Sequence, residues 1–138
     1  MNSSLFEKIY LAVVCGKLPK KIGTINAPIA RKENSIIERK VSNNGQTAIT
    51  HYEVLQEFEN YSLVKCILET GRTHQIRVHM AHISHPLLGD SLYSSYNQSL
   101  INRQALHSYK MNFIHPISKQ EISLVAPLPK DINKLISQ

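Results

Sequence analysis

Residues 71–80 read Gly-Arg-Thr-His-Gln-Ile-Arg-Val-His-Met, a run dense in basic and polar side chains at the expected start of a helix. A strand-like run, residues 61–70, precedes it, and Gly71 interrupts that run. Thr73 is predicted to cap the helix, because its side-chain oxygen can accept a hydrogen bond from a free backbone N–H. The apolar residues that follow are spaced i, i+4, i+7 and i+11, which predicts one face packed on a sheet. They are Ile76, Met80, Ile83 and Leu87.

The composition is that of a globular domain with an excess of basic residues. The 138 residues, of which 42% are hydrophobic, suffice for one domain with a core. The net charge of +6 favours an anionic partner, nucleic acid before an acidic membrane surface; a basic protein without such a partner has the same composition. No apolar run approaches the roughly 20 residues that span a bilayer. Glu7 and Lys8 interrupt the first apolar segment, which argues against a signal peptide. We therefore expect a cytoplasmic protein.

The two cysteines, Cys15 and Cys66, lie in apolar, strand-like runs and lack the spacing of metal ligands. Buried, reduced thiols are expected, with a disulfide as the alternative.

Residues 8–15, Lys-Ile-Tyr-Leu-Ala-Val-Val-Cys, form a nearly continuous apolar run that ends at Gly16. Such a run predicts a central strand covered on both faces. Alternation along a strand places Tyr10 on one face with Ala12 and Val14. A core tyrosine with a satisfied hydroxyl is one interpretation of Tyr10, and a functional phenol is the other.

The sequence between residues 17 and 40 is basic and is punctuated by Pro19, Gly23 and Pro28, which predicts loops and short extended pieces. It forms either a solvated loop or a surface that faces phosphate groups. Asn43-Asn44-Gly45 suits a tight hairpin between strands at 38–42 and 47–58.

A further strand is expected at 61–68, and the helix that follows should end before Pro86. Strands at 110–115 and Glu121–Val125 and a last helix at Lys130–Ile136 complete the pattern. The predicted class is α+β, a mixed, mostly antiparallel sheet with the motif helix on one side, in a single domain spanning residues 1–138.

His79, His82 and His85 are spaced i, i+3 and i+6, but no cysteine and only Asp90 lies near them. Packed or hydrogen-bonded histidines are therefore expected rather than a metal site. No Gly-x-Ser-x-Gly turn and no glycine-rich phosphate loop occurs in the sequence. Aspartate is scarce, since Asp90 and Asp131 are the only two.

The run at 71–79, with His-Pro-Leu-Leu-Gly-Asp at 85–90 and Tyr93, resembles the third conserved motif of the RluA-type RNA pseudouridine synthases. Residues 8–16 resemble their second motif. The similarity extends from about residue 7 to residue 135. Similar segments occur in the family's order at Ala48, Thr50, Tyr52 and Val54, at Leu106-His107, at His115-Pro116 and at 126–129.

This resemblance implies an isomerase that converts uridine in ribosomal or transfer RNA to pseudouridine, without cofactor or metal and with no membrane partner. The target base is flipped out of its stack. Tyr10 would stack on that base and is a candidate for removal of the C5 proton, and Arg77 would pair with the essential aspartate. Ile76 and Leu87 would help to close the pocket. The residues expected at the RNA are Arg72, Thr73, His74, Gln75, Lys17, Lys20 and Lys21.

The family carries its aspartate in a His-Arg-Leu-Asp motif that precedes the second motif, and no such motif occurs before Lys8. Asp90 matches a different family position and is not expected to replace it. Arg77 is therefore predicted to be solvated, bound to an anion or paired with a carboxylate of another chain. We expect an incomplete catalytic domain that is inactive alone.

Missing N-terminal strands would leave an open sheet edge, which predicts binding of the missing half or self-association. The alternatives are a non-catalytic RNA-binding remnant, one part of a split enzyme, and a folded fragment without function.

Overall fold

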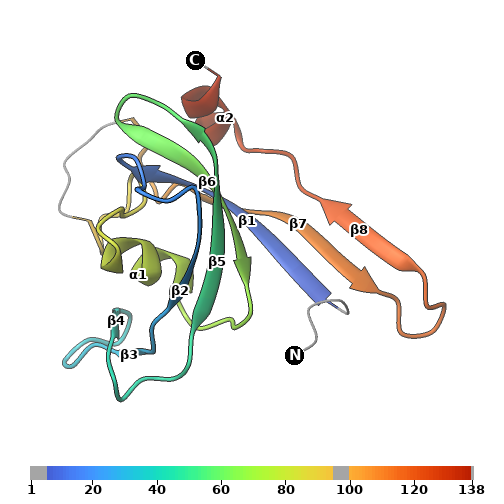
Figure 1. The fold of residues 1–138 in the computed structure, drawn as a ribbon, viewed down its shortest axis with the longest axis horizontal. Coiled ribbons are helices and arrows are strands. Elements are labelled where there is room, and N and C mark those ends of the chain that lie inside the picture. The colour runs from blue at the N-terminus through green and yellow to red at the C-terminus, as the bar shows by residue number, and fades with distance from the viewer. Residues whose placement is uncertain (1–5, 95–99, 138) are drawn as a thin grey trace.

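The computed structural model describes residues 6–94 and 100–137, which form a twisted sheet with one helix on each face (Figure 1). The strands of the main sheet lie in the order β2-β5-β6-β1-β7-β8, and β3 pairs separately with β4. All the described strand pairs are antiparallel, so the predicted α+β class with a mostly antiparallel sheet is confirmed. The elements are β1 (Phe6–Cys15), β2 (Ile22–Asn26), β3 (Ile29–Arg31), β4 (Arg39–Val41), β5 (Ile49–Glu57), β6 (Tyr61–Leu68), α1 (Gln75–His82), β7 (Leu106–Ile114), β8 (Glu121–Val125) and α2 (Lys130–Ile136).

β1 is the central strand, and its two faces belong to two different cores, as its apolar run predicts. Ala12 and Val14 pack under α1 with Ile76, Met80 and other residues of the first core. On the opposite face of the sheet, Leu11, Val13 and Cys15 join the second core, which α2 covers with Ile132 and Leu135. The side of β1 that carries Tyr10 is therefore the side that carries the motif helix.

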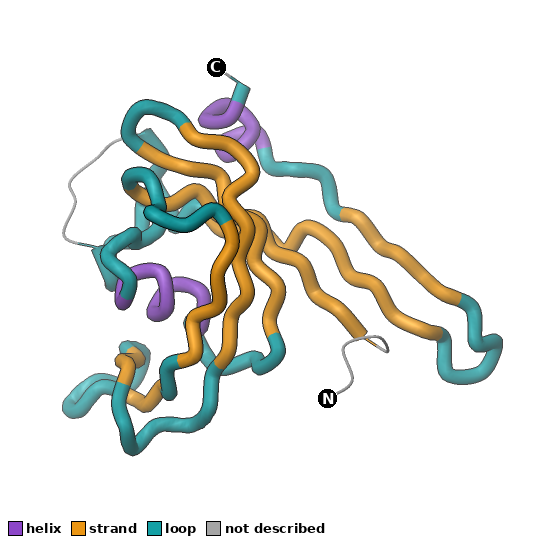
Figure 2. The backbone as a smooth tube through the Cα atoms, viewed as in Figure 1, coloured by secondary structure: helices purple, strands orange, loops and turns teal. Residues whose placement is uncertain are grey.

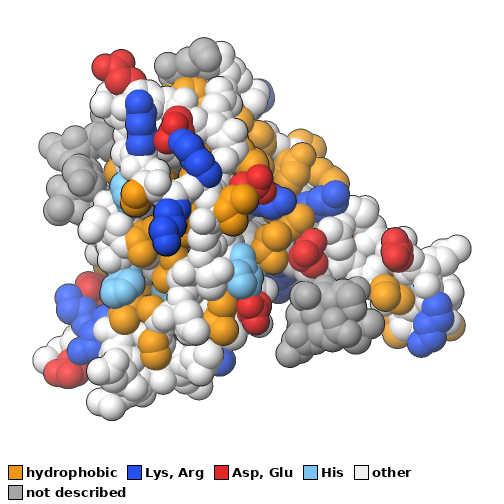
Figure 3. All heavy atoms as spheres, viewed as in Figure 1, with side chains coloured by type: hydrophobic (Ala, Val, Ile, Leu, Met, Phe, Trp, Pro, Cys, Tyr) orange, Lys and Arg blue, Asp and Glu red, His pale blue; other side chains and the backbone are white. Residues whose placement is uncertain are grey.

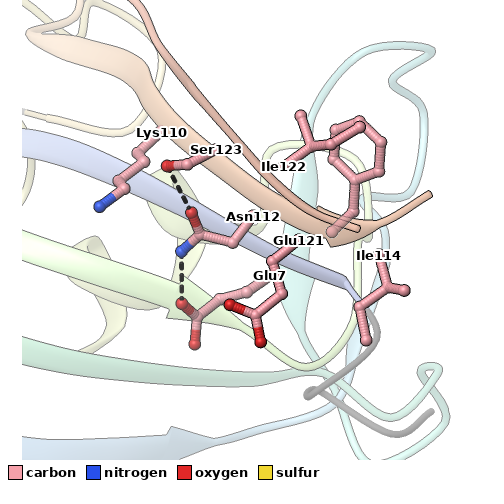
Figure 4. Close-up of a pocket in the computed structure, with 8 residues that line it drawn as sticks. Glu7, Lys110, Asn112, Ile114, Glu121, Ile122 and Ser123 are labelled. Carbon is pink, nitrogen blue, oxygen red and sulfur yellow. Dashed lines mark hydrogen bonds between the residues drawn. The ribbon is translucent and has the colours of Figure 1, made fainter. Parts of the chain in front are cut away.

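The β7–β8 hairpin extends beyond this layered body together with the first residues of β1 (Figure 2). No residue of β7 or β8 is buried. Alternation along the two strands gives this arm one apolar face, made by Met111, Phe113, Ile122 and Leu124. Its other face carries polar side chains beside Ile114 and Val125: Asn112 donates to Glu7 and accepts from Ser123, at 3.2 and 2.8 Å (Figure 4).

The predicted hairpin around residues 43–45 is wrong. A tight turn does form there, with Gly45 N–H donating to Ser42 O at 2.8 Å, but β4 and β5 do not pair. β5 already has β2 on one edge and β6 on the other, so β4 pairs with β3 instead. The residues of the turn determine that the chain reverses direction there. The strand edges that remain free determine that β4 pairs with β3.

The predicted cap at Thr73 is also wrong. α1 begins one residue later than that cap requires, and its N-cap is His74, in the left-handed region at φ 56° and without a side-chain capping bond. The helix ends at His82, in agreement with the predicted end before Pro86. Leu87 lies beyond it and forms a bridge to Val14 of β1.

Among the described residues, neither helix has the length and apolar character that crossing a membrane requires.

Candidate active site

Tyr10 lines a cleft of about 290 Å³ between β1 and the segment that leaves β6 for the motif helix. On the central strand it lies opposite Cys66 of β6 and Ser108 of β7, so its backbone is fixed on both sides. Its side chain is half-buried against the first core. The remaining lining residues are Lys8, Leu68, Glu69, Thr70, Gly71 and Arg72. The cleft therefore combines an aromatic ring with charged groups of both signs.

Gln75 holds the Gly71–Arg72 wall of this cleft in place. Its side-chain oxygen accepts from the Thr70 hydroxyl at 2.7 Å and from the Arg72 N–H at 3.0 Å. Its amide nitrogen donates to the Ile49 carbonyl and the Thr50 hydroxyl, both at 3.0 Å. Gln75 is only 2% exposed. All of these bonds are internal and the Gln75 side chain is buried, so the structure places Gln75 in the framework of the cleft, and its contact with RNA stays a prediction.

The same network continues into the core through His79, which is fully buried. Thr50 Oγ1 lies 2.8 Å from His79 Nδ1, and Nε2 lies 2.9 Å from the Ala27 carbonyl. Because a carbonyl can only accept, Nε2 carries the proton and Nδ1 accepts from Thr50. Burial lowers the pKa of His79, against the opposing effect of the Ala27 bond.

His82 is exposed, and His85 donates from Nδ1 to the Cys15 carbonyl at 2.8 Å. The three histidines thus have separate environments, and no metal-type group of three ligands occurs in residues 6–94 and 100–137.

Arg77 pairs with Asp90 of this same chain, so the prediction that Arg77 is solvated, bound to an anion or paired with a carboxylate of another chain is wrong. Arg77 Nε and Nη2 donate to Oδ2 and Oδ1 of Asp90 at 2.9 and 2.8 Å. The side chains are 14% and 1% exposed. The turn after Pro86 swings Asp90 back onto the helix, where the N–H groups of Leu92 and Tyr93 also donate to it.

The electrostatics of this pair follow from its geometry. Burial alone would raise the pKa of Asp90, but the hydrogen bonds from Arg77 and from the two backbone N–H groups outweigh it and hold that pKa below its ordinary value. The same bond to Asp90 raises the pKa of Arg77. The Tyr93 ring lies under the guanidinium, 5.1 Å from its carbon to the ring centroid.

His74 and Tyr93 extend this cluster towards β4. The Tyr93 hydroxyl lies 2.7 Å from His74 Nδ1 and accepts the Arg39 N–H at 2.9 Å. Burial and the charges of Arg77 and Arg39 lower the pKa of His74. His74 is half-buried and is therefore part of the packing between α1, β4 and the turn that carries Tyr93.

The structure separates the other predicted site residues. Ile76 and Leu87 are buried in the first core and are not among the residues that line the Tyr10 cleft, and their role in closing a pocket stays a prediction. Arg77 is also absent from the cleft lining.

Lys17, Lys20 and Lys21 are exposed, and Lys21 pairs with Glu57. The three lysines follow Gly16, whose N–H donates to the Asn60 carbonyl in the turn before β6. Arg72 follows the last residue of β6, so the lysines and Arg72 lie near opposite ends of that strand. Figure 3 shows basic side chains in more than one group on the face it presents, one of them over the β3–β4 hairpin.

Sequence reasoning missed Lys8 and Glu69 in the Tyr10 cleft and Tyr93 beside Arg77. The period of two along β1 already places Lys8 on the Tyr10 face and could have found it. Nothing in the local pattern indicates that Glu69 lines the cleft or that Tyr93, although part of the motif, lies beside Arg77, because sheet pairing and the turn after Pro86 bring them to their sites.

Comparison with known proteins identifies the class. The family model described as RNA pseudouridylate synthase matches residues 1–82, and the chain belongs to this family. Over 135 residues it is 48% identical to the uncharacterized RNA pseudouridine synthase YjbO of Bacillus subtilis, covering 98% of this chain and 47% of that protein. It is 38% identical over 150 residues to ribosomal large subunit pseudouridine synthase D of Xylella fastidiosa, covering 99% of this chain and 45% of that protein.

Among solved structures, human RNA pseudouridylate synthase domain containing 1 superposes with a TM-score of 0.78 at 25% identity, over 92% of this chain and 56% of that one. The chain spans about half the length of the curated relatives it matches.

Proposed function

We propose that this chain supplies the Tyr10 part of an RNA pseudouridine synthase site, which isomerises uridine in ribosomal or transfer RNA when a second polypeptide segment provides the catalytic aspartate. The observation that carries the proposal is the position of Tyr10. Its ring is half-buried on the central strand and shares one cleft with Arg72 of the motif that resembles the family's third motif.

In the proposed reaction a flipped uracil enters the cleft and stacks on Tyr10. The bond from N1 to the ribose breaks, and a bond from C5 to the same carbon forms. C5 loses a proton and N1 gains one, so the reaction is balanced without oxidant or reductant. The Tyr10 phenol is the candidate group for the transfer of the C5 proton.

Arg77 is proposed to contact the incoming aspartate with its remaining nitrogen. Asp90 occupies Nε and Nη2, and Nη1 has no hydrogen-bond partner among the described residues. A second carboxylate could accept from Nη1 without breaking the pair with Asp90. Arg77 then orients the aspartate from a position that Asp90 and Tyr93 have fixed in advance.

The apolar face of the β7–β8 arm is the proposed docking surface for the second segment. The curated relatives are about twice as long as this chain, and Leu124 of this face is 55% exposed. The face lies on the Tyr10 side of the sheet, because Met111 pairs with Lys8, two residues before Tyr10. Association of two copies through the β8 edge is the competing arrangement.

The decisive experiment measures tritium release from C5-labelled uridine in ribosomal and transfer RNA. The isolated chain should release no tritium, and addition of a separately expressed N-terminal half of a relative, with its aspartate, should restore release. Tyr10→Phe should abolish the restored activity, whereas Tyr109→Phe, a matched change on the neighbouring strand, should retain it. Turnover by the isolated chain would show that the aspartate is not needed from elsewhere.

A non-catalytic RNA-binding role is the second candidate, and the Arg77–Asp90 pair favours it. This pair neutralises the charge of Arg77 without the family's aspartate, so the fold of the chain does not depend on completing the site. This role predicts an RNA affinity that falls steeply with salt. It also predicts no tritium release when the N-terminal half is supplied.

We propose a cytoplasmic location for this activity. The free thiols of Cys15 and Cys66, both buried, support it, because reduced cysteines are typical of that compartment. Fractionation of cells that express a tagged chain tests this location.

A further inference from the structure

Three arginines from separate parts of the chain line one groove beside the Tyr10 cleft. The groove has a volume of about 310 Å³, and Arg31 of β3, Arg39 of β4 and Arg72 of the motif contribute to it. The other residues that line the groove are Ile29, Ala30, Asn44, Gly45, Gln46 and Thr73. Arg72 also lines the Tyr10 cleft, so the two hollows are neighbours on one surface.

Arg31 and Arg39 are directly opposite each other in the β3–β4 pair. Like charges at such a position destabilise a strand pair, because the two side chains lie on the same face at close range. An anion between the two guanidinium groups removes that repulsion. Repulsion between the two arginines therefore destabilises the short β3–β4 pair, and a bound anion would offset this repulsion.

Nearby carboxylates neutralise the lysines of this hairpin but not its arginines. Lys32 pairs with Glu38 at 3.0 Å and Lys40 with Glu33 at 3.5 Å. No ion pair within residues 6–94 and 100–137 involves Arg31, Arg39 or Arg72. The uncompensated charge of the hairpin is thus concentrated on the groove.

Two of the three guanidinium groups are held in place by backbone carbonyls. Arg39 Nη1 donates to the carbonyls of Ile36, Ile37 and Glu38 at 3.1, 3.1 and 3.2 Å. Arg72 Nε donates to the Thr47 carbonyl at 2.7 Å. Each of these arginines keeps other N–H donors for a ligand, and little side-chain entropy remains to be lost on binding.

We infer that this groove binds successive backbone phosphates of the RNA strand whose uridine occupies the Tyr10 cleft, an inference that rests on the proposed function. Arginine forks match phosphate oxygens in pairs, which suits a strand that passes through the groove. Because Arg72 borders both hollows, the strand runs from Tyr10 across Arg72 to the β3–β4 hairpin. Lys17, Lys20 and Lys21, which the sequence predicts at the RNA together with Arg72, lie off this path, because they follow Gly16 at the other end of β6.

The test compares three variants that each remove three positive charges. They are Arg31→Gln/Arg39→Gln/Arg72→Gln in the groove, Lys17→Gln/Lys20→Gln/Lys21→Gln in the lysine group that the sequence also predicts at the RNA, and Lys119→Gln/Lys130→Gln/Lys134→Gln at exposed positions elsewhere. Binding of a labelled RNA hairpin with uridines in its loop is followed by fluorescence anisotropy over a range of salt concentrations. Each phosphate contact contributes about 0.7 to the slope of log K against log salt for a single strand.

The arginine variant should lose about 2 from the magnitude of this slope, and both lysine variants should lose less than half as much. Equal losses in all three would show that only net charge matters and would overturn the inference. A larger loss at Lys17, Lys20 and Lys21 would place the phosphates there instead. Circular dichroism verifies that each variant is folded.

A second variant, Arg31→Gln alone, covers the case in which the triple variant unfolds the β3–β4 hairpin because the bonds from Arg39 to the carbonyls of residues 36–38 are lost. Arg31 is exposed and has no side-chain partner among the described residues, so this change leaves the fold intact. It should reduce the slope by about 0.7, and an unchanged slope would contradict the inference. If the unmodified chain binds no RNA at any salt concentration, both the groove inference and the proposed function fail. If it binds RNA and the arginine variants behave like the lysine controls, only the groove inference is refuted.

Discussion

Arg77 and Asp90 form a two-pronged ion pair in which separate nitrogens of the guanidinium donate to separate oxygens of the carboxylate, at 2.9 and 2.8 Å. The pair joins the motif helix to the turn after Pro86, thirteen residues further along the chain. It is nearly inaccessible, since the Asp90 side chain is 1% exposed. A pair of this kind fixes the turn in place and also keeps Arg77 charged in a partly desolvated position.

Asp90→Asn should destabilise the chain by about 3–5 kcal/mol, because it leaves the Arg77 charge without its counter-ion. Urea unfolding measures this loss. Asp131→Asn is the matched control: Arg103 and Asp131 form the same two-pronged geometry, at 2.9 and 3.0 Å, but their side chains are 37% and 38% exposed. The control should change stability by less than about 1 kcal/mol. Equal effects of the two substitutions would contradict the role given to burial.

Stability should fall as the pH drops below about 6.5, the ordinary pKa of histidine, because burial holds the pKa of His79 below that value in the folded chain. Below that pH the unfolded chain binds a proton at His79 that the folded chain does not bind, so acid favours unfolding. The free energy of unfolding falls by up to about 1.4 kcal/mol per pH unit. Urea midpoints measured between pH 8 and pH 5 test this. His79→Gln should weaken the dependence and leave the part that comes from His74, whose pKa is also lowered, whereas His82→Gln, an exposed change on the same helix, should retain it in full.

Gly89→Ala should destabilise the chain by more than about 2 kcal/mol. Gly89 has φ +74°, and a Cβ there would lie 1.9 Å from the Arg103 carbonyl oxygen. Gly71→Ala provides the contrast, because nothing lies within 4 Å of a Cβ at that position. Thermal melting of the two variants should show a large shift for Gly89 alone, and a normal melting temperature for Gly89→Ala would mean that the turn can rearrange.

Both thiols should resist alkylation and disulfide exchange in the folded chain at pH 8. Burial raises the pKa of Cys66 to about 12 and also raises that of Cys15, so almost no thiolate forms, and both side chains are buried. A colorimetric thiol reagent should therefore titrate neither cysteine in buffer and both in urea. Rapid reaction of either thiol in buffer would show local opening of the sheet.

The sequence determined the elements whose signal is local. The apolar run of β1 and its alternation assigned Val13 and Val14 to opposite cores, and Pro86 limited the helix, because burial and backbone sterics act within a few residues. The motif around Arg77 also indicated the family that the comparisons show.

Only the tertiary structure decided the partners. β5 pairs with β2 and β6 and therefore not with β4. The turn after Pro86 places the Asp90 carboxylate against Arg77. The pairing of β3 with β4 places Arg31 opposite Arg39. Each of these contacts joins residues whose separation along the chain carries no local pattern. Competition for strand edges, desolvation and charge select them only when the chain has folded.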